Sequence, residues 1–167
     1  METIDSIAKR VSIRKYQPKL VPKEMIERLV DAGRRAPTAR AVEPWEFVAV
    51  TEKAVLDKLG GLATTGNFIR DSACCIAVFC RDTKYYLEDG SAATENILIA
   101  AADLGLGACW IAGDKKPYAA QVCELLGGTP DLKLVSLISV GWPAEDIRQN
   151  KHRPIHQVLH WGKYSPK

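Results

Sequence analysis

The chain has 167 residues, of which 47% are hydrophobic and 26% charged, a balance typical of globular proteins rather than of disordered tails. Its formal net charge of +3 is too small to argue for a nucleic acid partner. No apolar run reaches the roughly 18 residues that a membrane helix needs. These properties favour one domain over residues 1–167, with no nucleic acid and no membrane as partners.

The first five residues are acidic and amphipathic, without the basic and apolar regions of a signal peptide. We therefore expect a cytoplasmic protein. Apolar residues at helical spacing then predict a short helix over 3–9 and a second helix from Pro22 to Gly33. Residues 34–44 contain two prolines and show no period, which predicts a loop.

Between the first two helices lies a basic run, residues 10–16, with the sequence RVSIRKY. Alternate residues of an extended segment point the same way, so Arg10, Ser12 and Arg14 would present two guanidinium groups and a hydroxyl to one target. Guanidinium groups donate bidentate hydrogen bonds that phosphate oxygens accept, so this target should be a phosphate. The alternative is a solvated basic surface strand.

The second part of the chain alternates strands with helices. The predicted elements are a strand over 45–50, a helix over 52–59 closed by Gly60 and Gly61, a strand over 73–80, a helix over 87–104, a strand over 108–111, a helix over 117–125, a strand over 133–140 and a basic tail with Arg148, Lys151 and Arg153. This order indicates an α+β or mixed α/β fold, with helices flanking a sheet.

Two of these segments have distinctive apolar patterns. Residues 73–80 are almost uninterruptedly apolar, which is typical of a central strand buried on both faces. Residues 87–104 are small or apolar on nearly all sides, so this helix should be buried on several sides and could lie at a subunit interface.

The cysteines and histidines give weaker signals. The five cysteines are odd in number and form no CxxC pair, which favours reduced thiols over a disulfide framework. His152, His156 and His160 are spaced by four, but no nearby residue supplies the further ligands of a metal site. A polar, partly exposed C-terminal segment is the better interpretation.

Three phosphate-binding or nucleophile motifs are absent: GxGxxG after the first strand, GxxxxGK[ST] and GxSxG. A phosphate-bearing ligand would therefore have to be held by side chains from separated segments.

Four segments together resemble the nitroreductase family of FMN-dependent oxidoreductases. They are the basic run, APTA at 36–39 leading to PWEF at 44–47, Glu95-Asn96 with LGLG at 104–107, and VGWPAE at 140–145. The likeness spans almost the whole chain. It implies an α+β, nitroreductase-like mixed sheet flanked by helices in an intertwined homodimer.

The resemblance also implies which residues hold FMN. Arg10, Ser12 and Arg14 would clamp its phosphate and ribityl chain, and Lys151 with Arg153 would close on the same phosphate. Pro37, Thr38 and Ala39 would reach the flavin of the partner subunit. Trp110, Ile111 and Ala112 would pass beside the ring, where a backbone N–H can donate to N5. Core packing for Trp45 and Trp110, and an ordinary turn at Pro37-Thr38, are the simpler interpretations.

This chain departs from the family in the loop before Pro44, where Ala41 and Glu43 replace the usual Asn and Gln. Alanine lacks the donor and the acceptor of an amide. Arg40 or Asn67 would then supply the missing contact to the flavin ring.

By resemblance, NADH or NADPH would reduce the flavin, and a nitroaromatic, quinone or similar planar acceptor would then reoxidise it in a ping-pong scheme. No residue of the protein is expected to act as acid or base, because the cofactor carries the chemistry. A flavin-binding carrier or sensor without turnover is the alternative. A helical interaction domain without a cofactor would leave the basic segments at both ends unexplained.

Overall fold

A computed structural model describes residues 2–147 and 152–166. Its elements, with 3-10 turns written as η, are α1 (Thr3–Lys9), α2 (Lys23–Arg34), η1 (Ala39–Ala41), β1 (Trp45–Val50), α3 (Lys53–Leu62), η2 (Asn67–Asp71), β2 (Cys74–Arg81), α4 (Tyr86–Asp103), β3 (Gly107–Ala112), α5 (Ala119–Leu125), β4 (Leu132–Gly141) and α6 (Ile155–Val158). The predicted α+β class is confirmed. None of the helices in these two ranges is both long and apolar enough to cross a membrane.

The four strands form one sheet in the order β1-β2-β4-β3, and every neighbouring pair is antiparallel. Strands β2 and β4 are central. Every residue of β2 except Arg81 is buried, which confirms the strand predicted from the apolar run. A strand with packed layers on both sides has no polar face, so its sequence loses the usual alternation.

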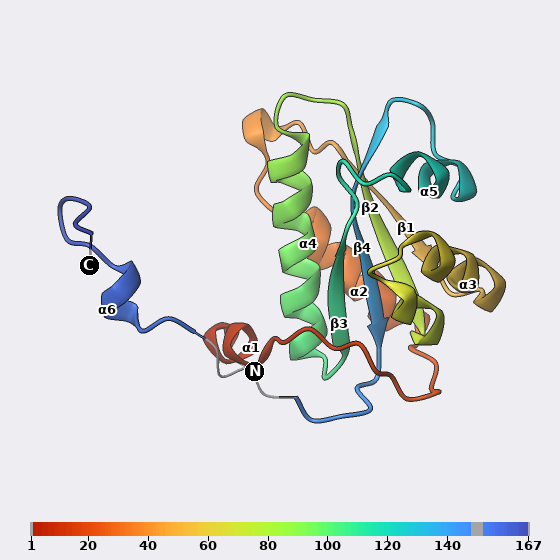
Figure 1. The fold of residues 1–167 in the computed structure, drawn as a ribbon, viewed down its shortest axis with the longest axis horizontal. Helices are drawn as coiled ribbons and strands as arrows, with labels where there is room; N and C mark the ends of the chain where they lie inside the picture. The colour runs from red at the N-terminus through yellow and green to blue at the C-terminus, as the bar shows by residue number, and fades with distance from the viewer. Residues whose placement is uncertain (1, 148–151, 167) are drawn as a thin grey trace.

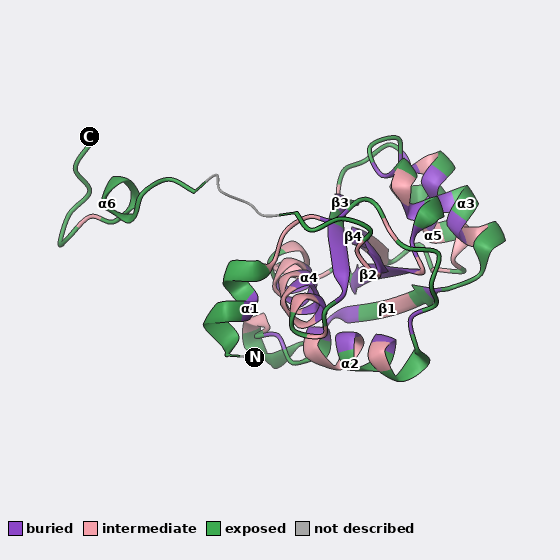
Figure 2. Cartoon of the chain, turned by 90° about the horizontal axis from the view of Figure 1, so that it is seen from below, coloured by how far each residue is buried: buried purple, intermediate pink, exposed green. Residues whose placement is uncertain are grey.

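Helices cover both faces of this sheet, as Figures 1 and 2 show. On one face, Ile76 and Val78 of β2 pack in a core with Leu29 of α2 and Ile97 of α4. On the other face, Phe79 packs in a second core with residues of α3 and α5. The predicted burial of α4 on several sides is confirmed, because α1, α2 and the sheet all contact it.

Helix α3 continues through the glycine pair that was expected to end it, and it stops at Leu62. Gly60 is required by packing rather than by helix termination, because a Cβ at this position would lie 2.9 Å from the carbonyl oxygen of Asn67. The glycine therefore permits η2 to pack closely against α3.

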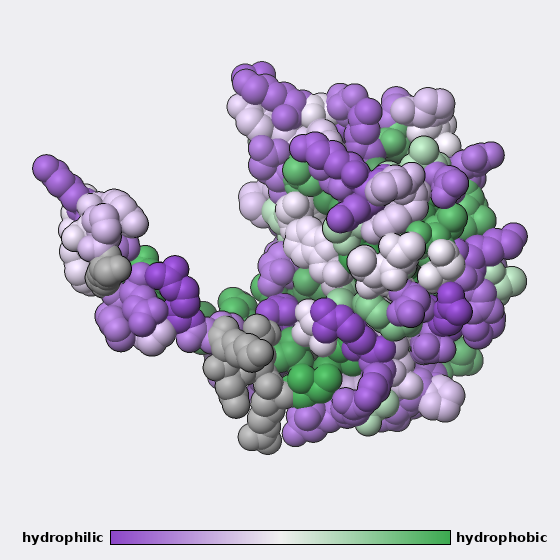
Figure 3. Space-filling view, viewed as in Figure 1, coloured by the Kyte–Doolittle hydropathy of each residue, from purple (hydrophilic) through white to green (hydrophobic). Residues whose placement is uncertain are grey.

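Residues 152–166 form an arm that stands apart from the rest of the fold in both ribbon views and in the space-filling view of Figure 3. Its apolar side chains are largely exposed, with Ile155 at 74%, Trp161 at 87% and Tyr164 at 77%. Helix α6 covers only Ile155–Val158, so the three histidines do not share one helix face.

Candidate functional site

The basic run is extended and lies beside β3. Ser12 forms a parallel bridge with Ala108, and the Ile13 N–H donates to the Ala108 carbonyl at 3.0 Å. Gly107 provides the necessary space, because a Cβ there would lie 2.7 Å from Ile13 Cγ2. Since Ile13 is buried in this contact, Ser12 and Arg14 point away from it.

Tyr16 anchors the end of the basic run. Its hydroxyl donates to the Ile13 carbonyl at 2.7 Å and hydrogen bonds with Ser139 Oγ at 2.7 Å. Burial raises the pKa of this phenol, so it remains a neutral hydrogen-bonding group at physiological pH. Arg14 is therefore held between two fixed residues of the same segment.

The thiol of Cys109 on β3 lies where the predicted clamp residues meet. Burial has the largest effect on this thiol and raises the pKa of Cys109, while nearby Arg14, Ser12 and Arg10 lower it by less. The thiol therefore stays protonated and uncharged at neutral pH. Two cationic side chains and one hydroxyl thus share one neighbourhood, and no thiolate cancels their charge.

Arg10 also contacts α4. Its Nε lies 3.6 Å from Glu95 Oε1, and the two side chains are 25% and 46% exposed. Ion pairs at such exposure contribute about 0 to 1 kcal/mol. A phosphate that accepts charge-assisted hydrogen bonds can therefore compete with Glu95 for Arg10.

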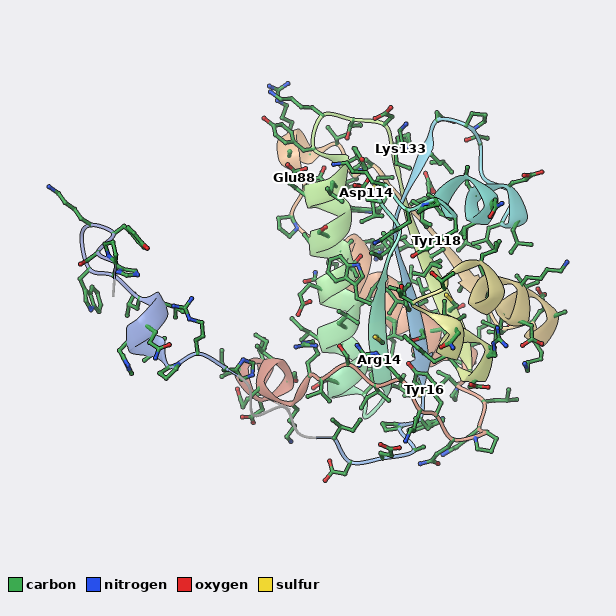
Figure 4. The ribbon with its side chains drawn as sticks, viewed as in Figure 1. Arg14, Tyr16, Glu88, Asp114, Tyr118 and Lys133 are labelled. Carbon is green, nitrogen blue, oxygen red and sulfur yellow. The ribbon has the colours of Figure 1, made fainter. Side chains whose placement is uncertain are left out.

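Arg14 lies close to η2, which carries Asn67. The Arg14 guanidinium carbon is 5.8 Å from the ring centroid of Phe68, and Figure 4 shows Arg14 and Tyr16 toward the same end of β3. Asn67 itself is exposed, and its carbonyl accepts a hydrogen bond from Arg70 Nε. The structure thus brings the segment of Asn67 to the clamp. Phe68 was not predicted, because an aromatic residue in a turn carries no phosphate-binding signal.

The predicted ring-facing segment of β3 divides between two faces. Trp110 is 37% exposed and Ala112 is exposed, whereas Ile111 is 3% exposed and belongs to the core beside α3 and α5. Strand alternation therefore turns the Ile111 side chain into the core, and the expected backbone contact from this segment stays a prediction. Core packing is correct for Trp45, which is 8% exposed, but not for Trp110.

The loop with Pro37, Thr38 and Ala39 is bound to the first turns of α4. Thr38 Oγ1 donates to Asp89 Oδ2 at 2.9 Å, and the Ala39 N–H donates to Asp89 Oδ1 at 2.9 Å. Ser12, by contrast, bridges to β3 just after α4 ends. Within one chain, the loop and the clamp thus lie toward opposite ends of α4 (Figures 1 and 4). No pattern in the sequence indicated Asp89, because it resembles an ordinary acidic residue in a first helical turn.

The two C-terminal clamp candidates are not brought to the basic run. Lys151 lies outside the described residues. Arg153 donates through Nη2 to the Gln157 carbonyl at 2.9 Å, on the arm that stands apart from β3 (Figures 1 and 2). Its expected contact with the same phosphate stays a prediction.

A cleft of about 410 Å³ lies between the start of the basic run and α4. Arg10 lines one part of it, and Glu145 and Asp146 line another. Carboxylates at a phosphate site repel the ligand. The cluster of Ser12 and Arg14 near Cys109 is therefore the better candidate for a phosphate site.

Comparison with known proteins identifies the family. The model of the nitroreductase family matches residues 7–73 and 69–142. The chain belongs to the nitroreductase family. A protein of Methanothermobacter thermautotrophicus, whose name includes the words NAD(P)H nitroreductase, is 33% identical to this chain over 152 residues, which cover 87% of this chain and 80% of that protein.

Two further relatives extend the comparison. The FMN reductase (NADPH) of Bacillus subtilis is 28% identical to this chain, and the match covers 98% of this chain and 74% of the reductase. The solved structure of an FMN-dependent nitroreductase from Clostridium difficile matches with a TM-score of 0.90 at 28% identity, covering 96% of this chain and 99% of that one. The predicted nitroreductase-like sheet flanked by helices is therefore confirmed, and the homodimer stays a prediction.

Proposed function

We propose that this nitroreductase is an FMN-dependent oxidoreductase that uses NAD(P)H to reduce planar acceptors. The single observation that carries the proposal is the extended basic run beside β3, in which Ile13 is buried and Ser12 and Arg14 point away from it, with Arg10 on the same alternate face. This donor set fits a phosphate, since it offers two guanidinium groups and a hydroxyl with no buried carboxylate among them. Relatives named for FMN, from B. subtilis and C. difficile, support the same cofactor.

The remaining contacts to FMN would come from several segments of what we take to be one FMN-binding domain over residues 1–167. Lys151 and Arg153 would add to the phosphate clamp. The exposed Asn67 and the outward face of β3, with Trp110 and Ala112, would lie along the ring. Ile111 would contribute only through its backbone. Pro37, Thr38 and Ala39 belong to a loop that would serve the partner's flavin.

Bound FMN would supply the electron-transfer chemistry, and the protein would supply position, charge and access. Arg10 and Arg14 would hold the phosphate, and a backbone N–H of β3 would orient the reactive edge of the ring. We further propose that NAD(P)H and the acceptor use one site in turn, in ping-pong order. Nitroaromatics and quinones are the acceptors that fit a flat site of this kind.

We also propose a homodimer, with the arm of residues 152–166 and α4 at the interface. The arm exposes Ile155, Trp161 and Tyr164 to solvent, and large exposed apolar surfaces mark interaction sites. A second copy could also bring its loop at Pro37 to the clamp, which one chain cannot do. Five free thiols support a reducing, cytoplasmic location.

Spectroscopy of the purified protein tests the cofactor and the turnover together. We expect a yellow protein that NADH or NADPH bleaches under anaerobic conditions and that a quinone or nitroaromatic reoxidises. A yellow protein that neither NADH nor NADPH bleaches would indicate the carrier instead. A colourless chain that FMN does not reconstitute would contradict both.

The loop before Pro44 supports a separate prediction. Ala41 has φ +54°, a left-handed conformation that asparagine tolerates better than alanine. Ala41→Asn should therefore stabilise the fold by about 0.5 kcal/mol and tighten FMN binding by up to about tenfold if the amide reaches the ring. Urea unfolding and FMN titration measure the two effects. A less stable variant would contradict the left-handed backbone.

A further inference from the structure

The loop that connects α2 to β1 has an unusual backbone. Arg40, Ala41 and Glu43 have φ values of +58°, +54° and +47°, although none of them is glycine. Side chains with a Cβ rarely adopt this region, because the Cβ approaches the following carbonyl oxygen. Such strain persists only where the surroundings hold it, and it gathers at ligand-binding and active sites.

Asp89 is the main residue that holds this strain. It is 5% exposed, and its two carboxylate oxygens accept hydrogen bonds from Thr38 Oγ1 and the Ala39 N–H, both at 2.9 Å. A carboxylate in the first turns of a helix is also stabilised by the helix dipole. A buried charge with two donors therefore fixes the start of the loop.

Arg81 fixes the other end. Its Nη2 donates to the carbonyls of Val42 at 3.4 Å and Glu43 at 3.1 Å. The Glu43 N–H in turn donates to Thr38 Oγ1 at 3.2 Å. The hydroxyl hydrogen of Thr38 is thus already used by Asp89, and its oxygen already accepts a bond from Glu43.

These contacts decide which loop groups are left for a ligand. Thr38 Oγ1 and the Ala39 N–H serve Asp89, and Ala41 has no polar side chain. Arg40 is exposed and lies within the strained turn. Its guanidinium is the charged donor that the loop offers outward.

We propose that Asp89 is a positioning residue that holds the loop so that Arg40 donates to the flavin ring bound in the partner subunit. This inference rests on the proposed function. Arg40 would replace the amide that Ala41 cannot supply. Reduced flavin carries more negative charge on its ring than oxidised flavin, so a guanidinium there binds the reduced form preferentially.

The test compares the dissociation constants of oxidised and reduced FMN for the dimeric holoprotein. Arg40→Ala and Asp89→Ala should each lower the preference for reduced FMN by about tenfold. The double variant should lose no more than either single variant, because both changes remove the same contact. Glu88→Ala, the preceding residue of α4, and Arg35→Ala are matched controls that should leave the preference unchanged.

If Asp89→Ala does not fold, Asp89→Asn replaces it in the test, because asparagine keeps the shape of the side chain and one acceptor oxygen. Asp89→Asn should lower the preference for reduced FMN by less than about tenfold. The inference would be overturned if the losses of the two single variants added up in the double variant, or if Arg40→Ala left the preference for reduced FMN unchanged. Either result leaves the proposed function intact, because the unaltered protein would still bind FMN. Failure of the unaltered protein to bind FMN would instead overturn the proposed function.

Mixed dimers test whether the loop acts on the partner. A chain with Arg14→Ala paired with a chain with Arg40→Ala would contain one site with both changes and one unaltered site. Half of the sites should then bind both forms of FMN with unaltered affinity. If Arg40 served its own chain, each site would carry one change, and no site would keep the original affinity.

Discussion

Arg14→Ala is expected to weaken FMN binding about tenfold to a hundredfold, because a charge-assisted hydrogen bond contributes about 1.5 to 3 kcal/mol. Arg14 is held between Ile13, which packs on β3, and Tyr16, which bonds to Ser139. Its guanidinium therefore reaches a ligand with little further ordering. Arg153→Ala should cause a loss of the same order. Quenching of flavin fluorescence measures both affinities.

Arg34 and Arg35 are the matched controls. Both are exposed and pair with Asp31 on α2, at 2.5 Å and 2.7 Å, so replacing either one should leave FMN affinity unchanged. Riboflavin lacks the phosphate, so it should bind more weakly and respond little to Arg14→Ala. Equal losses for FMN and riboflavin, or equal losses at Arg34, would mean that the basic run is only a charged surface.

Trp161→Ala is expected to weaken the homodimer by about 2 to 4 kcal/mol, the range of an aromatic interface residue whose loss dominates binding. Trp161 is 87% exposed in the single chain, so its removal should leave the stability of the monomer unchanged. Sedimentation equilibrium over a concentration series separates the two quantities. Lys163→Ala, on the same arm, removes charge rather than aromatic surface and should matter less.

A monomer at micromolar concentration that still binds FMN would contradict the dimer. A dimer that Trp161→Ala does not weaken would contradict only the role of the arm, and would leave α4 as the interface element.

Local patterns predicted most of the fold. The run over 73–80 became β2, because its residues lie between two packed cores and need no polar face. The prediction that Ser12 and Arg14 point the opposite way from Ile13 also agrees with the structure, because the segment is extended beside β3 and its side chains alternate with a period of two. The end of α3 was predicted less well, because packing against η2, rather than helix termination, requires Gly60.

The sequence by itself determined the α+β class and the residue types of the proposed phosphate clamp, because hydrophobic periodicity and side-chain chemistry are local properties. Only the tertiary structure decided that Asp89 holds Thr38, a residue 51 positions away, and that the loop after it is left-handed. The tertiary structure also decided that the Ile111 side chain lies in the core and that the arm of residues 152–166 stands apart from β3. These outcomes depend on contacts between distant segments, whose free energy no local pattern contains.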